Sequence, residues 1–142
     1  MTTNLERFKA IDVAYNARDW EAYSALLDES FAGWMMGGAT SESKAEHVRA
    51  AQQFCAVSSD NQVHHSPYVV AFSHGEWTCT IARFTGTMTG PIPTAQGKVL
   101  EPTHRLFETS FATISRWVDG KIVEEHEFLD AKAILLQIGA TE

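Results

Sequence analysis

The sequence has few cysteines, no long apolar stretch and no cluster of basic residues, and each absence excludes a class of protein. Only two cysteines occur among 142 residues, Cys55 and Cys79, and their spacing matches neither a C-x-x-C motif nor a catalytic signature. Buried free thiols are therefore expected rather than a disulfide. No apolar run approaches the ~20 residues that a membrane span needs, so we expect no membrane partner.

The charge balance argues against nucleic acid as a partner. The formal net charge is −7, whereas binding to the phosphate backbone requires a basic patch. Residues 1–7 lack the basic-then-apolar order of a secretion signal, which favours a cytoplasmic location. With 44% hydrophobic residues in 142, the chain suits one domain, residues 1–142, with a real core.

Helical patterns occupy the first half of the chain. Leu5, Phe8, Ile11 and Tyr15 recur at three- and four-residue steps, which predicts a helix whose other face exposes Glu6, Lys9 and Asp12. A second short helix is expected from Trp20 to about Asp28, and a short strand or turn over residues 31–36. The segment from Ser43 to Glu46 is a capping box that opens a third helix through Cys55.

From residue 62 onward the pattern changes to short runs of β-branched and aromatic residues. We expect strands at residues 63–71, 76–89, 106–117 and 121–129, and a final helix over residues 130–138. Helices followed by consecutive strands predict an α+β domain in which an antiparallel sheet is covered by helices on one face. The Pro- and Gly-rich residues 90–102 form either a mobile cover for a pocket mouth or an ordinary connection.

Three stretches of the second half carry a family resemblance. They are Gly-Thr-Met-Thr-Gly-Pro at 86–91, Pro-Thr-His-Arg at 102–105, and Asp-Gly-Lys-Ile-Val-Glu-Glu-His-Glu at 119–127 followed by Leu-Leu-Gln-Ile-Gly at 135–139. Together they resemble the SnoaL-like polyketide cyclases of the nuclear-transport-factor-2-like superfamily. The resemblance implies a strongly curved, cone-like antiparallel sheet, a half-barrel roofed by N-terminal helices around a pocket, commonly in a homodimer.

The resemblance also implies an activity. Its best-known members close a ring in polyketide esters by an intramolecular aldol reaction, without metal or organic cofactor, using an acidic residue as acid and base. Glu127 stands where relatives usually have Asp, Met88 where they often have His, and Thr113 where active cyclases can place another His. No cofactor and no metal are therefore expected, and the partner is a small hydrophobic molecule.

Glu127 is the first candidate for a catalytic base. Proton abstraction beside a carbonyl needs a base whose pKa is raised toward neutrality, and a carboxyl in an apolar pocket acquires such a pKa by desolvation. Glu124, Glu125 and His126 precede it on the same strand, and His126 is the candidate acid or orienting group. The alternative is that these side chains face water on the outer side of the strand.

Strand alternation separates these candidates into two sets. Glu125 and Glu127 point one way, and Glu124 and His126 the other. A two-residue loop at Asp119-Gly120 pairs Thr113 with His126, whereas a three-residue loop with a bulge at Gly120 pairs Thr113 with Glu125. We prefer the bulged loop, which brings Glu127 to the same face as Thr113.

Further residues complete the predicted binding site. We expect Trp34 and Met88 at the ligand surface and include His65, Thr113 and Glu125 as substrate contacts. His64 and His65 are adjacent on a strand, and we favour one surface and one core histidine over a metal site. Asp130 is expected to be the N-cap of the last helix.

Three functions fit these observations. The first is cofactor-independent acid/base catalysis on a small carbonyl compound, with Glu127 as the base. The second is a non-catalytic binding protein that keeps the pocket, which Met88 and Thr113 would suit. The third is an epoxide-hydrolase-like hydrolase, which an Asp-Arg-Asp arrangement in the pocket would favour.

Overall fold

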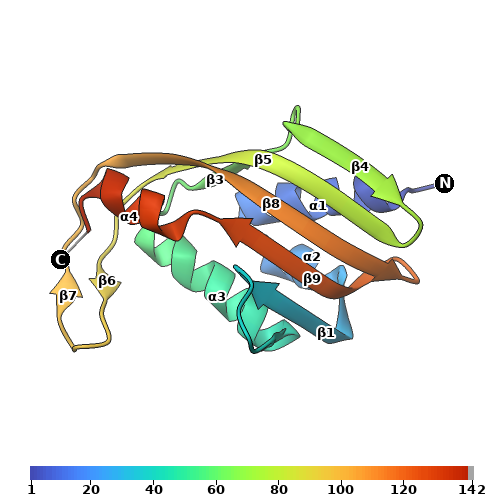
Figure 1. The fold of residues 1–142 in the computed structure, drawn as a ribbon, viewed down its shortest axis with the longest axis horizontal. Coiled ribbons are helices and arrows are strands. Elements are labelled where there is room, and N and C mark those ends of the chain that lie inside the picture. Colours follow the sequence, from blue (N-terminus) through green and yellow to red (C-terminus); the bar gives the residue numbers. More distant parts are fainter. Residues whose placement is uncertain (141–142) are drawn as a thin grey trace.

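The computed structural model describes residues 1–140 and consists of a helical layer against one curved sheet (Figure 1). In chain order its elements are α1 (Asn4–Ala17), α2 (Trp20–Ala25), β1 (Leu27–Met35), β2 (Glu42–Ser43), α3 (Lys44–Val57), β3 (Gln62–His64), β4 (Val70–His74), β5 (Trp77–Thr87), β6 (Ile92–Pro93), β7 (Val99–Leu100), β8 (Leu106–Val118), β9 (Lys121–Leu129) and α4 (Ala131–Ile138). No helix in residues 1–140 is long and apolar enough to cross a membrane.

The predicted helices form, with two corrections. The Ser43–Glu46 capping box begins α3 as predicted, and Asp130 caps α4 by accepting the Ala133 amide at 2.9 Å. The second helix ends at Ala25 rather than near Asp28, because Leu27 already pairs with Ile122 in the sheet. The other correction is Asp12, which is buried rather than exposed.

The sheet confirms the α+β class and contains one parallel pair. Its strand order is β2-β1-β9-β8-β5-β3, with β4 also paired to β5. All these pairs are antiparallel except β1 with β9. The expectation of a purely antiparallel sheet therefore fails at this pair, where the helices and strands between β1 and β9 form a long crossover connection.

The strand expected over residues 63–71 is divided in two. β3 ends at His64 and β4 begins at Val70, and both pair with β5. The peptide bond between Ser66 and Pro67 is cis, and the segment between the two strands includes Tyr68. Because the strand is divided here, Tyr68 lies next to α1, and its hydroxyl donates a hydrogen bond to Asp12.

The β8–β9 turn has neither of the two predicted registers. Asp119 and Gly120, both with positive φ, form a two-residue loop that joins Val118 to Lys121. A bulge follows, since Trp117 pairs with Ile122 but Arg116 pairs with Glu124, which leaves one extra residue in β9. Thr113 consequently faces Glu127 across the two strands. The predicted outcome, that Thr113, Glu125 and Glu127 share one face, is nevertheless correct.

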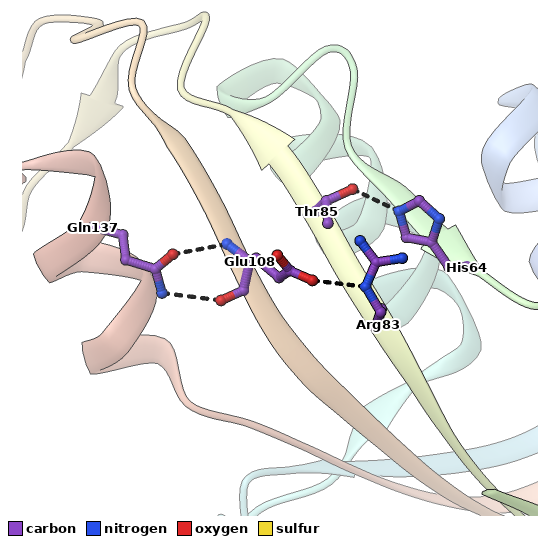
Figure 2. A network of polar contacts seen from close by, with 5 residues as sticks. All are labelled: His64, Arg83, Thr85, Glu108 and Gln137. Carbon is purple, nitrogen blue, oxygen red and sulfur yellow. Dashed lines mark hydrogen bonds and ion pairs between the residues drawn. The ribbon is translucent and has the colours of Figure 1, made fainter. Parts of the chain in front are cut away.

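The C-terminal helix is tied to the sheet by side-chain contacts to a strand backbone. The Gln137 side chain accepts a hydrogen bond from the Glu108 backbone amide at 2.8 Å and donates one to the Glu108 backbone carbonyl at 3.0 Å (Figure 2). The Glu108 carboxylate forms an ion pair with Arg83 at 2.6 Å. His64 lies beside this network and bonds Thr85 at 2.7 Å. These contacts fix α4 against the end of β8.

Residues 90–102 contain the short β6–β7 hairpin, which projects from the end of the molecule where α4 lies (Figure 1). Ile92 and its proline neighbours border an apolar groove of about 620 Å³ together with α3 and α4. Phe54 and Leu129 border both this groove and the inner cavity. The segment therefore contains a short hairpin that lies beside one end of the inner cavity.

Candidate active site

A cavity of about 130 Å³ lies between the helices and the concave face of the sheet. Most of its wall is aromatic or aliphatic, and the polar part is acidic. The apolar lining consists of Phe8, Ile11, Met35, Ala50, Ala51, Phe54, Val63, Phe84, Phe111 and Leu129. The polar lining consists of Asp12, Tyr15, Tyr23, Glu42, His47, Thr113, Glu125 and Glu127. The described lining thus contains four carboxyl groups and neither lysine nor arginine.

One histidine and two glutamates form the centre of the acidic wall. The His47 Nε2 atom lies 3.4 Å from Glu125 Oε1 and 3.4 Å from Glu127 Oε1. Glu125 also accepts a hydrogen bond from the Ser115 hydroxyl at 3.0 Å. The Tyr23 hydroxyl lies 2.9 Å from His47 Nε2, and its ring is stacked on the imidazole. This packing holds the imidazole between α2 and β9.

The two glutamates cannot both be charged at little cost. Burial raises the pKa of Glu127 well above its ordinary value, and the neighbouring Glu125 raises it further by charge repulsion and by a hydrogen bond between the two carboxyls. Two adjacent buried carboxyls favour a state in which they share one proton. The pKa of Glu127 is therefore shifted in the direction that a general base working near neutral pH requires.

A third carboxyl reaches the cavity from the helical wall. Asp12 lies on the buried face of α1 and accepts a hydrogen bond from the Tyr68 hydroxyl at 2.5 Å. Burial raises the pKa of Asp12 to about 7; the Tyr68 bond lowers it and the charge of Glu125 raises it. Asp12 thus titrates near neutral pH.

Three of the predicted site residues come together in this cavity. Glu127, Glu125 and Thr113 are buried and line it. The bulge in β9 explains this, because without it the two-residue turn would pair Thr113 with His126 and bring His126 to the inner face. Glu127 is 9% exposed, so it is not one of the solvent-facing acids of the alternative interpretation.

His126 and Trp34 lie on the opposite face of the sheet. Their rings stack at 5.1 Å, and His126 Nε2 contacts Glu124 Oε2 at 2.7 Å. Since neighbours along a strand alternate between faces, placing Glu125 and Glu127 inside places His126 outside. Neither ring lines the cavity, so the predicted roles of His126 as acid and Trp34 as ligand contact do not fit this cavity.

Met88 and His65 are also absent from the described lining. Met88 is 1% exposed and packs in the core, where its sulfur faces the Thr103 hydroxyl at 3.5 Å. It follows the end of β5 and pairs through its backbone with the 104–105 segment, away from the cavity. His65 lies in the connection between β3 and β4, with its ring 6.4 Å from that of Tyr68.

Sequence reasoning missed Asp12, His47 and Tyr68. The spacing of Asp12 held the signal, because it stands four residues after Phe8 and three before Tyr15, within the apolar stripe of α1. His47 similarly precedes Ala51 by four residues and Phe54 by seven. A polar residue inside an apolar stripe indicates a buried polar site. Tyr68 gave no such signal, since its position depends on the division between β3 and β4.

The inner trio also has the composition of a metal site. Donor atoms of His47, Glu125 and Glu127 all lie within 4.8 Å of one another. Tetrahedral zinc with bonds of about 2.0–2.2 Å would separate its ligand atoms by about 3.4 Å, which is the distance from His47 to each carboxyl. The Tyr23 hydroxyl competes for the same Nε2 atom. A cation could therefore bind only by displacing Tyr23 and the proton shared by the glutamates.

The helices and the curved sheet enclose an acid-lined cavity, which defines the protein as an α+β domain with an internal pocket. Residues 6–138 match the SnoaL-like polyketide cyclase family, and the chain belongs to that family. The resemblance inferred from the three sequence stretches is thereby confirmed. No curated protein matches this sequence.

Solved structures of similar fold include three bacterial proteins. IdmH of Streptomyces antibioticus, named as a candidate polyketide cyclase, shares 21% identity at a TM-score of 0.82, covering 97% of this chain and 99% of its own. A candidate SnoaL-like polyketide cyclase from Jannaschia sp. CCS1 shares 17% identity at a TM-score of 0.81, and the match covers 98% of this chain and 93% of the other. AclR of Streptomyces galilaeus, named as a candidate hydroxylase, shares 16% identity at a TM-score of 0.80, and the match covers 98% of this chain and 97% of the other. Identities this low show the common fold alone.

Proposed function

We propose that the protein is a cofactor-independent acid/base enzyme that closes a ring in a small hydrophobic carbonyl compound, with Glu127 as the catalytic base. The burial of the Glu127 carboxyl in an otherwise apolar cavity, beside Glu125 and His47, is the observation that carries the proposal. Membership of the SnoaL-like polyketide cyclase family supports the reaction class. Because fold alone does not fix the substrate, the compound is defined only by its chemistry.

The reaction needs one proton to be removed and later returned. The Glu127 carboxylate takes a proton from the carbon next to a carbonyl, and the resulting enolate carbon attacks a second carbonyl of the same molecule. A carbon–carbon bond forms, and the alkoxide takes the proton back from Glu127. Glu125, held by Ser115, and His47 orient the Glu127 carboxyl, while the aromatic wall holds the substrate.

The hydrolase hypothesis receives no support from the described cavity. An arginine between two aspartates would favour it, and the lining of the cavity contains Asp12 but no arginine. The non-catalytic hypothesis differs from the proposal only in turnover. A direct measurement of proton abstraction separates the two.

The test uses an enolisable bicyclic ketone, 2-tetralone, and follows exchange of its α-protons for deuterium by NMR. Glu127→Gln should lower the exchange rate by about 10²–10⁴-fold, because the amide cannot accept the proton. Glu124→Gln is the matched control: it makes the same change on the same strand, on the outer face. Equal exchange rates for wild type and Glu127→Gln would reject Glu127 as the base.

We also propose that the protein forms a homodimer through the convex face of the sheet. A row of side chains crosses five strands on this face, since successive members are directly paired neighbours: Phe72, Cys79, Ile114, His126 and Trp34. Phe72 is 55% and Ile114 is 37% exposed. An exposed apolar row on a broad sheet supports association with a second copy.

A further inference from the structure

We propose that Asp12 is a second catalytic residue, the proton donor to the carbonyl oxygen of the substrate, and that Tyr68 positions it. This inference rests on the proposed function, in which Glu127 removes the carbon-bound proton. Asp12 lies on α1 in the helical wall of the cavity, and Glu127 lies on β9 in the sheet wall. A ketone held in the cavity between these walls can meet both carboxyls.

The hydrogen bond from Tyr68 determines which oxygen of Asp12 carries the proton. The Tyr68 hydroxyl donates to Oδ2, so a protonated Asp12 carries its hydrogen on Oδ1. Oδ1 has no hydrogen-bond partner among residues 1–140. In this part of the chain every fully buried side-chain polar atom has a partner, so Oδ1 is not fully buried. Since Asp12 also lines the cavity, Oδ1 is the atom available to a ligand.

The environment of Asp12 keeps a proton on it near neutral pH. Burial raises its pKa to about 7, and no lysine or arginine lines the cavity to offset this effect. The ionisable groups that share the cavity wall, besides Tyr68, are Tyr15, Tyr23, Glu42, His47, Glu125 and Glu127. Of these, Glu125 acts on Asp12 by charge repulsion and raises its pKa further.

The two carboxyls divide one reaction between them. As Glu127 takes the proton from carbon, electron density moves onto the carbonyl oxygen, which takes the proton from Asp12 Oδ1. The product of this step is the neutral enol, with Glu127 protonated and Asp12 ionised. The Tyr68 hydroxyl stabilises the new Asp12 carboxylate by its short hydrogen bond. Placing the donor opposite the base avoids a free enolate in an acidic cavity.

The inference predicts a specific pH dependence of 2-tetralone exchange. Asp12 acts in its protonated form, so exchange should fall as the pH rises through about 7. The Tyr68 bond lowers the pKa of Asp12, and Tyr68→Phe should therefore move this fall to higher pH. Asp12→Asn keeps an N–H donor that does not titrate, so the fall should disappear while the rate drops about 10-fold. Asp12→Ala should lower the rate by about 10²–10³-fold.

Several outcomes would overturn the inference. A fall in rate that stays at the same pH in both Tyr68→Phe and Asp12→Asn would assign the fall to a group other than Asp12. Loss of exchange in Asp12→Asn as deep as in Asp12→Ala would make Asp12 a base instead of a donor. If Glu127→Gln abolishes exchange and the Asp12 and Tyr68 variants match wild type, the donor role fails and the proposed function stands. If wild type and Glu127→Gln exchange equally, both fail.

A binding measurement tests the donor role without turnover. Wild-type protein should bind 2-tetralone more tightly than tetralin, the hydrocarbon of the same shape that lacks the carbonyl, and this preference should shrink about 10-fold in Asp12→Ala. Urea unfolding of each variant at the assay pH shows that it is folded. An unchanged preference in folded Asp12→Ala would contradict a hydrogen bond from Asp12 to the carbonyl.

Discussion

The two faces of strand β9 carry the same kinds of side chain and differ in their surroundings. On the concave face, Glu125 and Glu127 meet His47 in the cavity between the sheet and the helices. On the convex face, Glu124 meets His126 at 2.7 Å, where both side chains are about one-third exposed. Burial raises the pKa of Glu127, whereas water screens the outer pair. The raised pKa of Glu127 therefore follows from its environment and not from its residue type.

Histidine substitutions should show the largest contrast between the faces. His47→Asn should reduce exchange of 2-tetralone by about 10²-fold, because it removes the imidazole that contacts both inner carboxyls. His126→Asn removes an imidazole from the outer face and should change the rate by less than about threefold. The measurement is deuterium exchange at fixed pH. Equal losses in the two variants would remove the distinction between the faces.

Carboxyl substitutions should affect stability in opposite directions inside and outside the cavity. The pKa of Asp12 is raised from 3.8 to about 7, so its contribution to folding is present below pH 3.8 and is lost as the pH rises through about 7. Asp12→Asn should consequently stabilise the protein by about 4 kcal/mol more at pH 8.5 than at pH 4. Urea unfolding at both pH values measures this.

Asp60 provides the control outside the cavity. Burial alone would raise its pKa, but the side-chain and backbone hydrogen bonds from Thr87 outweigh that effect and lower it. Its contribution is therefore present at neutral pH and is lost as the pH falls through its lowered pKa. Asp60→Asn should destabilise the protein by about 0.5–1 kcal/mol at pH 7. Stabilisation by both substitutions would contradict the contrast.

Removal of metal should have a smaller effect. Since the His47 Nε2 atom faces the Tyr23 hydroxyl and the two glutamates share a hydrogen bond, turnover should stay within about twofold after dialysis against EDTA. The exchange assay before and after dialysis provides the test. Activity lost on chelation and restored by Zn²⁺ would instead assign the inner trio to a metal site.

The smallest effect on turnover is expected from the convex face. Ile114→Glu places a charge in the exposed row and should shift the protein from dimer to monomer in light scattering after size exclusion. The exchange rate per chain should change by less than about twofold, because Ile114 does not line the cavity. A monomeric wild type would refute the dimer, and a large loss of turnover would link the outer face to the site.

The sequence predicted the parts of the fold that depend on local chemistry. The Ser43–Glu46 capping box, the Asp130 cap and the whole of β9 follow from neighbouring residues, and the structure has them as expected. The parallel pairing of β1 with β9 was not predictable in this way, because pairing between distant strands depends on the complete fold.

The site was predicted in part for the same reason. Glu125, Glu127 and Thr113 came from one hairpin and one family motif, and they share the cavity. The exact register was wrong because a bulge of one residue is not encoded by the turn at Asp119-Gly120. His47 comes from α3 and meets the glutamates only through tertiary packing.

The position of β9 in the sheet has a consequence for biosynthesis. β9 follows both β1 and β8 in the chain, yet it lies between them in the sheet. Until β9 has been synthesised, the only strand beside β1 in the described fold is the two-residue β2. The other edge of β1 is then open to association with other nascent chains. Translation stalling ahead of β9 would therefore yield an aggregation-prone fragment that also lacks Glu127.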